Sequence, residues 1–384
     1  MREKGYMKSV ERRRLLYFMH VPWGWIKQRP HFLAAELNKY YDITLFYQNS
    51  FKKMQLVENA VPGGMRVKKL LLFPYGRYDF VLQNNLAVRF QVKVHENDIV
   101  WITHPNMYVV IEKLIRNKNT LVVYDCMDDI LEFPGVRSNP SRMENLRKRE
   151  NSLVQRADVV LASSEHLREK LIQRYGEIKQ ITVVNNALDL GSAMSTDSPL
   201  EKNISEPVLS QFRKASRAVT YIGTISEWMD WGIVLGSLEK FSEITYFFFG
   251  AVETAMPKHD RILSFGPVEH SLVFPIMGLS DALVMPFKVN ELIRSVNPVK
   301  LYEYIYSGKP AIAPRYPETE RFGGYVTLYA NKDEYFAFLH KVIKKEIRST
   351  ADPGERRKFV SSNTWEKRGE TITGIIASAL HNKL

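Results

Sequence analysis

The sequence contains a single cysteine, Cys126, among 384 residues. One cysteine cannot form a disulfide framework within the chain, and such frameworks are typical of proteins that fold in oxidising compartments. The sequence therefore favours a reducing environment, and we expect a cytoplasmic protein.

Long apolar runs are also missing. No stretch reaches the roughly 18 residues that a membrane-spanning helix needs. The strongest N-terminal candidate, LLYFMHVPWGWI (residues 15–26), is interrupted by His20, Pro22 and Gly24. This pattern is typical of a buried strand followed by a turn, not of a signal peptide.

Acidic residues are outnumbered, with 42 Asp and Glu against 54 Lys and Arg and a net charge of +12. A basic protein is suited to nucleic acid, to an anionic membrane surface or to anionic small molecules. No nucleic-acid motif is recognised, so we expect no nucleic-acid partner. The basic head MREKGYMKSVERRR (1–14) is either a solvated terminus or a contact to the inner face of the cell membrane.

Short apolar runs alternate with helical patterns along the whole chain. Strands are expected at 14–20, 42–47, 66–73, 98–103, 120–125, 157–163 and 181–185, and again at 218–223, 244–250, 261–266, 281–287, 310–314 and 325–330. Helices are expected at 28–40, 143–156, 231–241, 269–278, 298–307, 332–345 and 364–382. This alternation indicates an α/β fold with parallel sheets covered by helices on both faces.

A chain of this length exceeds one hydrophobic core, so two domains are expected. The segment 191–207 is rich in Ser, Asp, Asn and Pro and fits a linker. It separates two doubly wound, Rossmann-like halves, an N-terminal domain at 1–190 and a C-terminal domain at 208–362, followed by a final helix in 363–384. Ligands of such sheets bind at the carboxyl ends of the strands, so the cleft between the domains is the expected site.

The stretch SVNPVKLYEYIYSGKP (295–310) predicts a helix whose first turn is suited to bind an anion. Pro298 suits a first helical turn and Asn297 is a favoured N-cap, while Gly308 is suited to end the helix. The amino end of a helix attracts anions such as phosphate.

Lys300 and Glu303 follow within this helix, on one face. Lys300 in the first turn opposes the helix dipole unless an anion binds there. A carboxylate one turn later is placed to accept hydrogen bonds from the two hydroxyls of a ribose. The pair predicts a nucleotide-sugar site, and a solvated Lys–Glu pair is the alternative.

The same stretch resembles the NPxKxxEYxxxGKP element of GT-B glycosyltransferases. The matching positions are Asn297, Pro298, Lys300, Glu303, Tyr304, Gly308, Lys309 and Pro310. Three further pieces are similar to other elements of the same family: YIGTISEWMD (221–230), SDALVMPF (280–287) and NTWEKR (363–368). Three pieces of the first half resemble N-terminal domain elements of bacterial cell-wall and capsule transferases, the teichuronic-acid type among them: QRPHFLAAEL (28–37), YDCMDD (124–129) and ADVVLASSEHL (157–167).

The resemblance implies the GT-B fold, with two Rossmann-like domains facing across a cleft and a last helix that crosses back to the N-terminal domain. It also implies a hexosyltransferase that moves a sugar from a nucleotide-sugar donor, UDP-linked, to a cell-surface glycan or lipid-linked acceptor. The C-terminal domain then holds the donor and the N-terminal domain the acceptor. We expect no metal and no cofactor, since this fold class neutralises the diphosphate with protein groups and the nucleotide-sugar is a substrate.

Two departures from the pattern leave the stereochemical outcome open. Ser295 stands where many retaining members carry the first Glu of a Glu-x7-Glu pair, and GTISEWMDWG (223–232) lacks their Lys or Arg after the glycine turn. Lys300, with Arg294 beside it, is therefore expected to carry the diphosphate charge. A catalytically silent nucleotide-sugar-binding subunit of a polysaccharide synthesis complex is the alternative function.

Residues near other strand ends are candidates for the same cleft. Gly24 after the first strand and Gly223 with Thr224 in the second domain would let the backbone approach a ligand, or only make tight turns. Arg29 opens the first helix, where it would contact the acceptor or solvate the helix start.

Three titratable residues are candidates for catalysis. His104 ends a strand and would act on the donor sugar or as a base, or else bond local backbone. Asp125 and Asp128 in YDCMDD would provide the base that takes a proton from the acceptor hydroxyl, or else cap a turn.

Overall fold

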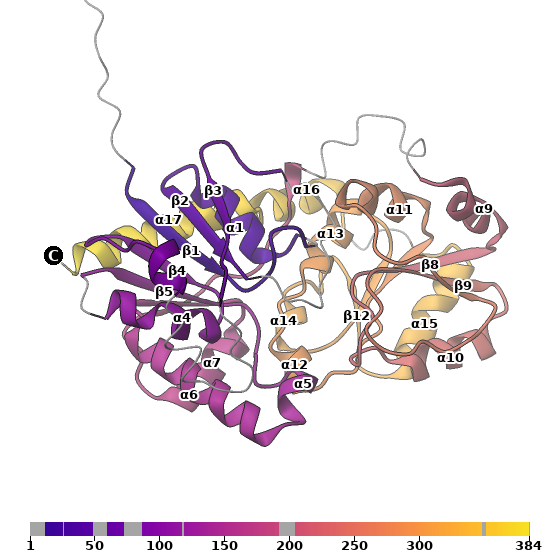
Figure 1. Ribbon diagram of the computed structural model, residues 1–384. Coiled ribbons are helices and arrows are strands. Elements are labelled where there is room, and N and C mark those ends of the chain that lie inside the picture. Colours follow the sequence, from indigo (N-terminus) through magenta and orange to yellow (C-terminus); the bar gives the residue numbers. More distant parts are fainter. Residues whose placement is uncertain are drawn as a thin grey trace, which may run out of the picture.

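The computed structural model describes residues 12–25, 27–48, 60–72, 87–116, 119–191, 204–347 and 351–383. Two α/β domains lie side by side, and Figure 1 shows the first half of the chain in indigo and magenta and the second in orange. Most of the basic head and most of the linker predicted at 191–207 lie outside the described residues.

The N-terminal sheet has seven parallel strands in the order β3-β2-β1-β4-β5-β6-β7. The strands are β1 (Arg14–Met19), β2 (Asp42–Tyr47), β3 (Arg66–Lys69), β4 (Ile99–Ile102), β5 (Leu121–Cys126), β6 (Val159–Ala162) and β7 (Ile181–Val183). The helices are α1 (Arg29–Leu37), α3 (Ala87–Gln91), α4 (Pro105–Ile115), α5 (Pro134–Arg137), α6 (Pro140–Arg156) and α7 (Glu165–Tyr175).

The C-terminal sheet has six parallel strands in the order β10-β9-β8-β11-β12-β13. The strands are β8 (Arg217–Ile222), β9 (Ile244–Phe249), β10 (Ile262–Ser264), β11 (Ala282–Val284), β12 (Ala311–Pro314) and β13 (Thr327–Tyr329). The helices are α9 (Glu206–Lys214), α10 (Trp231–Lys240), η1 (His270–Leu272), α11 (Val273–Leu279), α12 (Glu291–Arg294), α13 (Val299–Ser307), α14 (Pro317–Glu320), α15 (Lys332–Ile343), α16 (Pro353–Ser362) and α17 (Trp365–His381).

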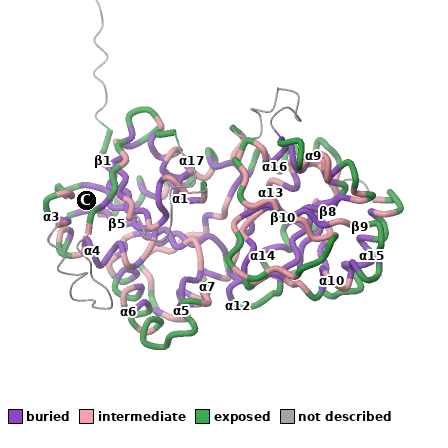
Figure 2. Tube along the Cα trace, turned by 45° about the vertical axis from the view of Figure 1, so that its right-hand side comes forward, coloured by how far each residue is buried: buried purple, intermediate pink, exposed green. Residues whose placement is uncertain are grey.

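The central strands are apolar because helices cover both faces of each sheet, whereas the edge strand β3 is basic and mostly exposed. Along β1, Leu16 and Phe18 enter one core while Leu15, Tyr17 and Met19 enter the core on the opposite face. This alternation follows from the two-residue period of a strand. In Figure 2 the buried residues concentrate in the two sheets, and exposed residues follow the outer helices and loops.

The last helix, α17, crosses back from the C-terminal domain and packs on α1 (Figure 1). Trp365 stacks on Phe32 with ring centroids 5.2 Å apart, and Ile372 and Ile376 lie in the N-terminal core. Thr364 caps the helix by accepting a hydrogen bond from the N–H of Lys367. The predicted α/β class, the two parallel sheets and the returning helix are thus confirmed.

Some element boundaries differ from the sequence prediction. The strand predicted at 281–287 pairs only over β11, and the strand predicted at 66–73 ends at Lys69. Helix α16 was not predicted, since its sequence is polar on most sides and only Val360 is buried. Among the described helices, none is long and apolar enough to cross a membrane.

Candidate functional site

A cavity of about 1470 Å³ lies between the two domains and is lined by both. In each sheet the strand order reverses beside the first strand, between β1 and β4 and between β8 and β11. The residues that follow these four strands reach the cavity: His20, Thr103, His104, Gly223, Thr224, Met285 and Phe287. The cavity therefore occupies the switch points at which doubly wound sheets bind ligands.

On the C-terminal wall, Lys300 crosses directly over Gly223. A Cβ atom on Gly223 would lie 2.1 Å from Cε and 2.6 Å from Nζ of Lys300, and the φ of Gly223 is +149°. Glycine suits this turn because other residues rarely adopt its backbone conformation, and a Cβ here would also displace the end of the Lys300 side chain. The next residue, Thr224, also lines the cavity and is held by the Tyr221 hydroxyl, which donates to its carbonyl at 2.8 Å.

The ammonium of Lys300 rests on aromatic rings. Its Nζ lies 5.5 Å from the ring centroid of Tyr221 and 6.0 Å from that of Phe287. Burial lowers the pKa of Lys300, and the nearby Glu303 carboxylate partly opposes the shift. An anion in the cavity would stabilise this charged, poorly hydrated group.

Glu303 lines the same wall, and its carboxylate lies near His270. Its side chain is 13% exposed, and Oε1 lies 3.7 Å from Nε2 of His270, whose Nδ1 is 4.0 Å from Asp189 in the N-terminal domain. Within the described residues, no ion pair joins Glu303 to Lys300, so the solvated Lys–Glu pair left open by the sequence is not formed. Both side chains face the cavity.

Asn297 is not the N-cap that the sequence predicts. The cap position of α13 is Pro298, which lines the cavity and offers no side-chain hydrogen bond, while Gly308 ends the helix in the left-handed conformation as predicted. The Asn297 side chain instead accepts from the N–H of Asn186 at 3.1 Å and donates to Glu318 at 3.3 Å. Asn297 thus joins the two domains, and the first N–H groups of α13 have no side-chain cap.

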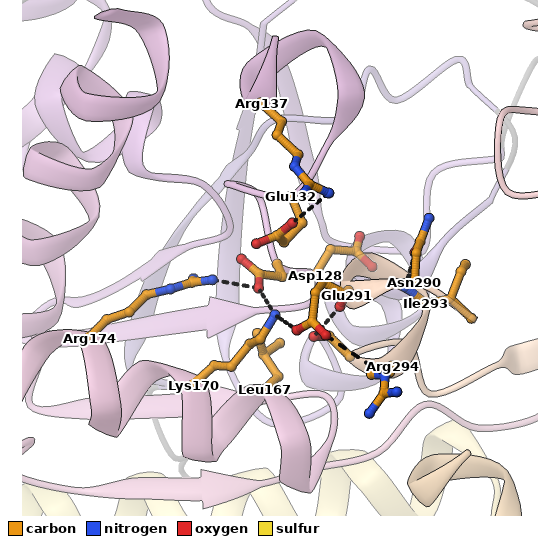
Figure 3. Close-up of polar contacts among 12 residues, drawn as sticks. Asp128, Glu132, Arg137, Leu167, Lys170, Arg174, Asn290, Glu291, Ile293 and Arg294 are labelled. Carbon is orange, nitrogen blue, oxygen red and sulfur yellow. Dashed lines mark hydrogen bonds and ion pairs between the residues drawn. The ribbon is translucent and has the colours of Figure 1, made fainter. Parts of the chain in front are cut away.

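Arg294 does not line the cavity. Figure 3 shows it beside Glu291 on α12, and its Nε lies 3.8 Å from that carboxylate. Glu291 also contacts Nζ of Lys170 on α7 at 3.0 Å, and the same ammonium lies 3.0 Å from Asp129. The predicted helper of Lys300 therefore belongs to a chain of charges between the domains.

Asp129 forms the buried end of that chain, where Arg174 adds a contact of 2.6 Å. Burial acts to raise the pKa of Asp129, but the hydrogen bonds and charges of Arg174 and Lys170 outweigh it and lower the pKa. The carboxylate of Asp129 therefore stays ionised as a structural counter-ion.

Asp128 and Asp125 occupy different places, although they lie three residues apart. Asp128 lines the cavity, and its pKa is raised to about 6 by burial and by the charges of Asp129 and Asp125, against the opposing charge of Arg29. Asp125 is fully buried and pairs with Arg29 at 2.8 Å, away from the cavity lining. Of these two residues, Asp128 lines the cavity, and its raised pKa is suited to a general base.

Arg29 is among the residues that line the cavity but is only 2% exposed. Besides Asp125, its guanidinium donates to the carbonyl of Val184 at 2.7 Å. Solvation of the helix start, one of the two roles that the sequence left open, is therefore wrong for Arg29. Gly24 lies outside the cavity lining, and the neighbouring Trp25 lines it instead.

His104 combines the two roles that the sequence left open. Its Nδ1 accepts from the N–H of Asn106 at 3.1 Å and caps α4, while the residue lines the cavity with its ring 5.1 Å from that of His20. Burial, with the charges of Arg149 and Arg142, lowers the pKa of His104 to about 4. The imidazole is therefore neutral at neutral pH.

Comparisons with known proteins show what this chain is similar to. Residues 31–192 match the family model described as Glycosyltransferase Family 4. Over 334 residues the chain is 25% identical to TuaH of Bacillus subtilis (strain 168), which is named for glycosyltransfer in teichuronic acid biosynthesis; the match spans 79% of this chain and 81% of TuaH.

Solved structures extend the similarity to nearly the whole chain. Sucrose-phosphate synthase from Thermosynechococcus elongatus has a TM-score of 0.70 at 10% identity, covering 97% of this chain and 100% of that one. HepE from Anabaena, in complex with UDP and glucose, has a TM-score of 0.69 at 16% identity, covering 95% and 100%. The chain has the GT-B fold of the glycosyltransferases. The resemblance stated from the sequence is confirmed.

Three residues of this GT-B cleft were not found from the sequence. His270 lies in the short helix η1 and contacts Glu303, and Arg142 and Arg149 line the opposite wall from α6. The two arginines are seven residues apart and so share a helix face, which the sequence shows. Which face meets the cavity depends on how the domains pack.

Proposed function

We propose that the protein is a glycosyltransferase that moves a sugar from a UDP-sugar donor to a cell-surface glycan or lipid-linked acceptor. The observation that carries the proposal is Lys300 crossing over Gly223 at the switch point of the second sheet, with Glu303 on the same wall. The HepE complexes with UDP and glucose and with UDP-glucose support UDP as the nucleotide, since HepE has the same fold.

In this proposal the C-terminal wall holds the leaving group. Lys300 and the uncapped N–H groups of α13 contact the diphosphate, and Glu303 accepts hydrogen bonds from the ribose hydroxyls. As the bond from the sugar to the diphosphate breaks, negative charge grows on the diphosphate, and these donors stabilise it.

The N-terminal wall supplies the acceptor side. Asp128, with a pKa of about 6, is ionised at neutral pH and accepts the proton of the attacking hydroxyl. The neutral ring of His104 offers a hydrogen bond to the bound sugar. Within the described residues no group of three or more His, Cys, Asp or Glu is placed to hold a metal ion, and the proposal assigns the diphosphate charge to protein groups.

A panel of nucleotides tests the donor site. UDP at about 100 times its dissociation constant would add roughly 2.7 kcal/mol to the free energy of unfolding, so the melting temperature is expected to rise with UDP and UDP-sugars. Purine nucleotides at equal concentration are the comparison. The donor assignment would be wrong if no uridine nucleotide raised the melting temperature at millimolar concentration.

A silent nucleotide-sugar-binding subunit is the second candidate, and Ser295 favours it. Ser295 is fully buried, its carbonyl accepts from the Ser164 hydroxyl of the other domain at 2.7 Å, and it offers no carboxylate to the cavity. Release of UDP from UDP-sugars in the presence of cell-envelope lipid extract separates the candidates. UDP binding without any turnover across the panel would favour the silent subunit.

A further inference from the structure

We propose that α6 and the start of α4 form a subsite in the cavity for an anionic group of the acceptor, a phosphate or a carboxylate. The subsite consists of Arg142 and Arg149 on α6 and Asn106 in the first turn of α4, and we call these three residues the anion subsite. All three line the cavity. The proposal rests on the proposed function and deepens it, because it names the chemical class of the acceptor.

Arg142 and Arg149 reach the cavity from one face of α6. They are seven residues apart, which is about two helical turns. Other cations of the same helix are already paired, since the exposed Arg147 and Lys148 lie 2.8 Å and 3.6 Å from the carboxylate of Glu144. In the part of the chain that the structure describes, no carboxylate forms an ion pair with Arg142. The cavity side of α6 therefore presents positive charge with which an anion can pair.

Neighbouring groups hold the two guanidinium groups in place. Nη1 of Arg142 donates to the carbonyl of Gly135 at 2.9 Å, and Nη1 of Arg149 donates to Oδ1 of Asn106 at 2.5 Å. A guanidinium carries five N–H donors in a planar fork that matches the oxygens of a phosphate or a carboxylate. Since the amide oxygen of Asn106 accepts from Arg149, its amide nitrogen is the atom that can donate to a ligand. Side chains anchored in this way lose less freedom when a ligand binds.

The positive charge of both arginines extends to His104. Burial is the main cause of the lowered pKa of His104, and the charges of Arg149 and Arg142 lower the pKa further. The amino end of α4, which His104 caps, adds the positive end of a helix dipole at the same place. Arg29 also lines the cavity, but its charge is balanced by the buried Asp125 at 2.8 Å. An anion at the subsite would therefore be attracted by two arginines and a helix end together.

The position of the subsite matches the acceptor and not the donor. Asp128, the proposed base, belongs with the two arginines to one segment of the chain, from β5 through α6. The donor diphosphate is assigned to Lys300 in the other domain. The cavity of about 1470 Å³ exceeds the roughly 300–1,000 Å³ typical of a site for one small ligand, so both substrates have room. The anionic group therefore belongs to the molecule whose hydroxyl Asp128 deprotonates.

Two kinds of acceptor carry such a group. A lipid-linked acceptor has a phosphate on the anomeric carbon of its sugar, and an acidic glycan has a carboxylate on a sugar ring. Both anions can accept two parallel hydrogen bonds from one guanidinium. Glucose 1-phosphate and methyl glucuronide represent the two kinds as soluble probes, and methyl glucoside is their neutral counterpart.

Calorimetric titration of these three probes into the full chain, with UDP at saturation, tests the proposal. UDP occupies the donor site, so the probes report on the rest of the cavity. The wild type is expected to bind at least one anionic probe about tenfold to a hundredfold more tightly than methyl glucoside, as for the gain of a charged hydrogen bond. A preference for glucose 1-phosphate would identify a carrier-linked acceptor, and a preference for methyl glucuronide would identify an acidic glycan.

Variants of α6 connect this selectivity to the arginines. Arg142→Gln and Arg149→Gln are expected to weaken binding of the preferred anionic probe by about tenfold to a hundredfold and to leave methyl glucoside unaffected. Arg147→Gln removes an exposed arginine of the same helix and is the matched control, with wild-type binding expected. Arg142 is exposed, so its variant keeps the test available if melting curves show that Arg149→Gln is unfolded.

Three results would each overturn the proposal. The first is equal binding of all three probes, and the second is no binding of either anionic probe at millimolar concentration. The third is a loss in Arg147→Gln as large as the loss in Arg142→Gln.

The ring of His104 provides a second measurement, which locates the probe. Its pKa of about 4 is followed by NMR, with His104→Asn used to assign the signal. A bound anion opposes the charges of Arg142 and Arg149, so an anionic probe at saturation is expected to raise the pKa of His104, whereas methyl glucoside is not. An unchanged pKa at saturation would place the probe outside the anion subsite and contradict the proposal.

UDP affinity keeps this proposal apart from the proposed function. Arg142→Gln and Arg149→Gln are expected to bind UDP like the wild type, because the groups assigned to the donor lie on the other domain. If UDP did not bind, the proposed function would fail, and arginine-dependent binding of an anionic probe would leave the anion subsite standing. UDP binding without selectivity among the probes would contradict the anion subsite alone.

Discussion

After β8 the chain turns at Gly223 and leaves room for Lys300, whereas after β1 the corresponding turn presents His20 and Trp25 to the cavity and keeps its glycine, Gly24, outside. Two sheets of the same topology therefore build different walls. On the C-terminal wall, Gly223 leaves its backbone uncovered by a side chain of its own, and Lys300 lies over it. The N-terminal wall carries His104 and Asp128, and burial has shifted the pKa of each side chain.

The proposed function gives proton transfer to the N-terminal wall and leaving-group binding to the C-terminal wall. Substituting Asp128→Asn is expected to lower turnover of UDP-sugar by about 10² to 10⁴, the usual contribution of a general base, with UDP affinity unchanged. Wild-type turnover is expected to fall as the pH drops through about 6, because the carboxyl group is then protonated. A pH–rate profile beside UDP titrations checks both, and equal loss of UDP affinity would break the assignment.

The raised pKa of Asp128 can also be tested through the pH dependence of protein stability. The pKa of Asp128 is raised from 3.8 to about 6, so the folded state binds more protons than the unfolded state within that window. The contribution of Asp128 to stability therefore decreases as the pH rises through the window. Asp128→Asn is expected to melt above the wild type at pH 8, with a difference that shrinks towards pH 4.

A substitution at the Gly223 turn tests the C-terminal wall in the same way. Gly223→Ala places a Cβ against Lys300 at a φ of +149°, so the ammonium must leave its position. We expect UDP affinity to fall by about tenfold to a hundredfold, as for the loss of a charged hydrogen bond. Gly24→Ala is the matched control in the other domain, and calorimetry should show wild-type affinity for it. Similar losses in both variants would mean that the walls do not differ as described.

The smallest expected effect lies between the walls, at Lys170. Lys170→Met leaves Glu291 without its interdomain partner and Asp129 with Arg174 alone, so the charge of Asp129 acts more strongly on Asp128. The acid limb of the pH–rate profile is expected to move to higher pH, with UDP affinity reduced a few-fold. Arg294→Met touches the same Glu291 from the exposed side and should change neither quantity.

Most of the fold could be predicted from local patterns in the sequence. The alternation of apolar runs and helical stretches predicted the two parallel sheets because buried strands in such sheets are apolar on both faces. Gly308 predicted the end of α13, since a left-handed cap needs glycine. The charge and spacing of Lys300 and Glu303 predicted which helix face would meet the cavity.

What the sequence did not predict depends on contacts between distant segments. Asn is a favoured residue type for a helix N-cap, but Asn297 hydrogen-bonds Asn186 and Glu318 instead, because the two domains meet there. Asp125 and Asp128 are equivalent in the sequence, and only the buried Arg29 separates a counter-ion from a cavity residue. Arg294 lies beside Glu291 of its own helix, α12, and does not assist Lys300.

Titration of UDP by calorimetry into the wild type, Lys300→Met and Glu303→Gln tests the donor site most directly. Lys341→Met, an exposed lysine on α15 outside the cavity lining, controls for the loss of one charge. We predict affinities about tenfold to a hundredfold weaker for Lys300→Met and Glu303→Gln, and wild-type affinity for the control. Wild-type affinity in both site variants, with melting curves showing that each is folded, would contradict a nucleotide site built on Lys300 and Glu303.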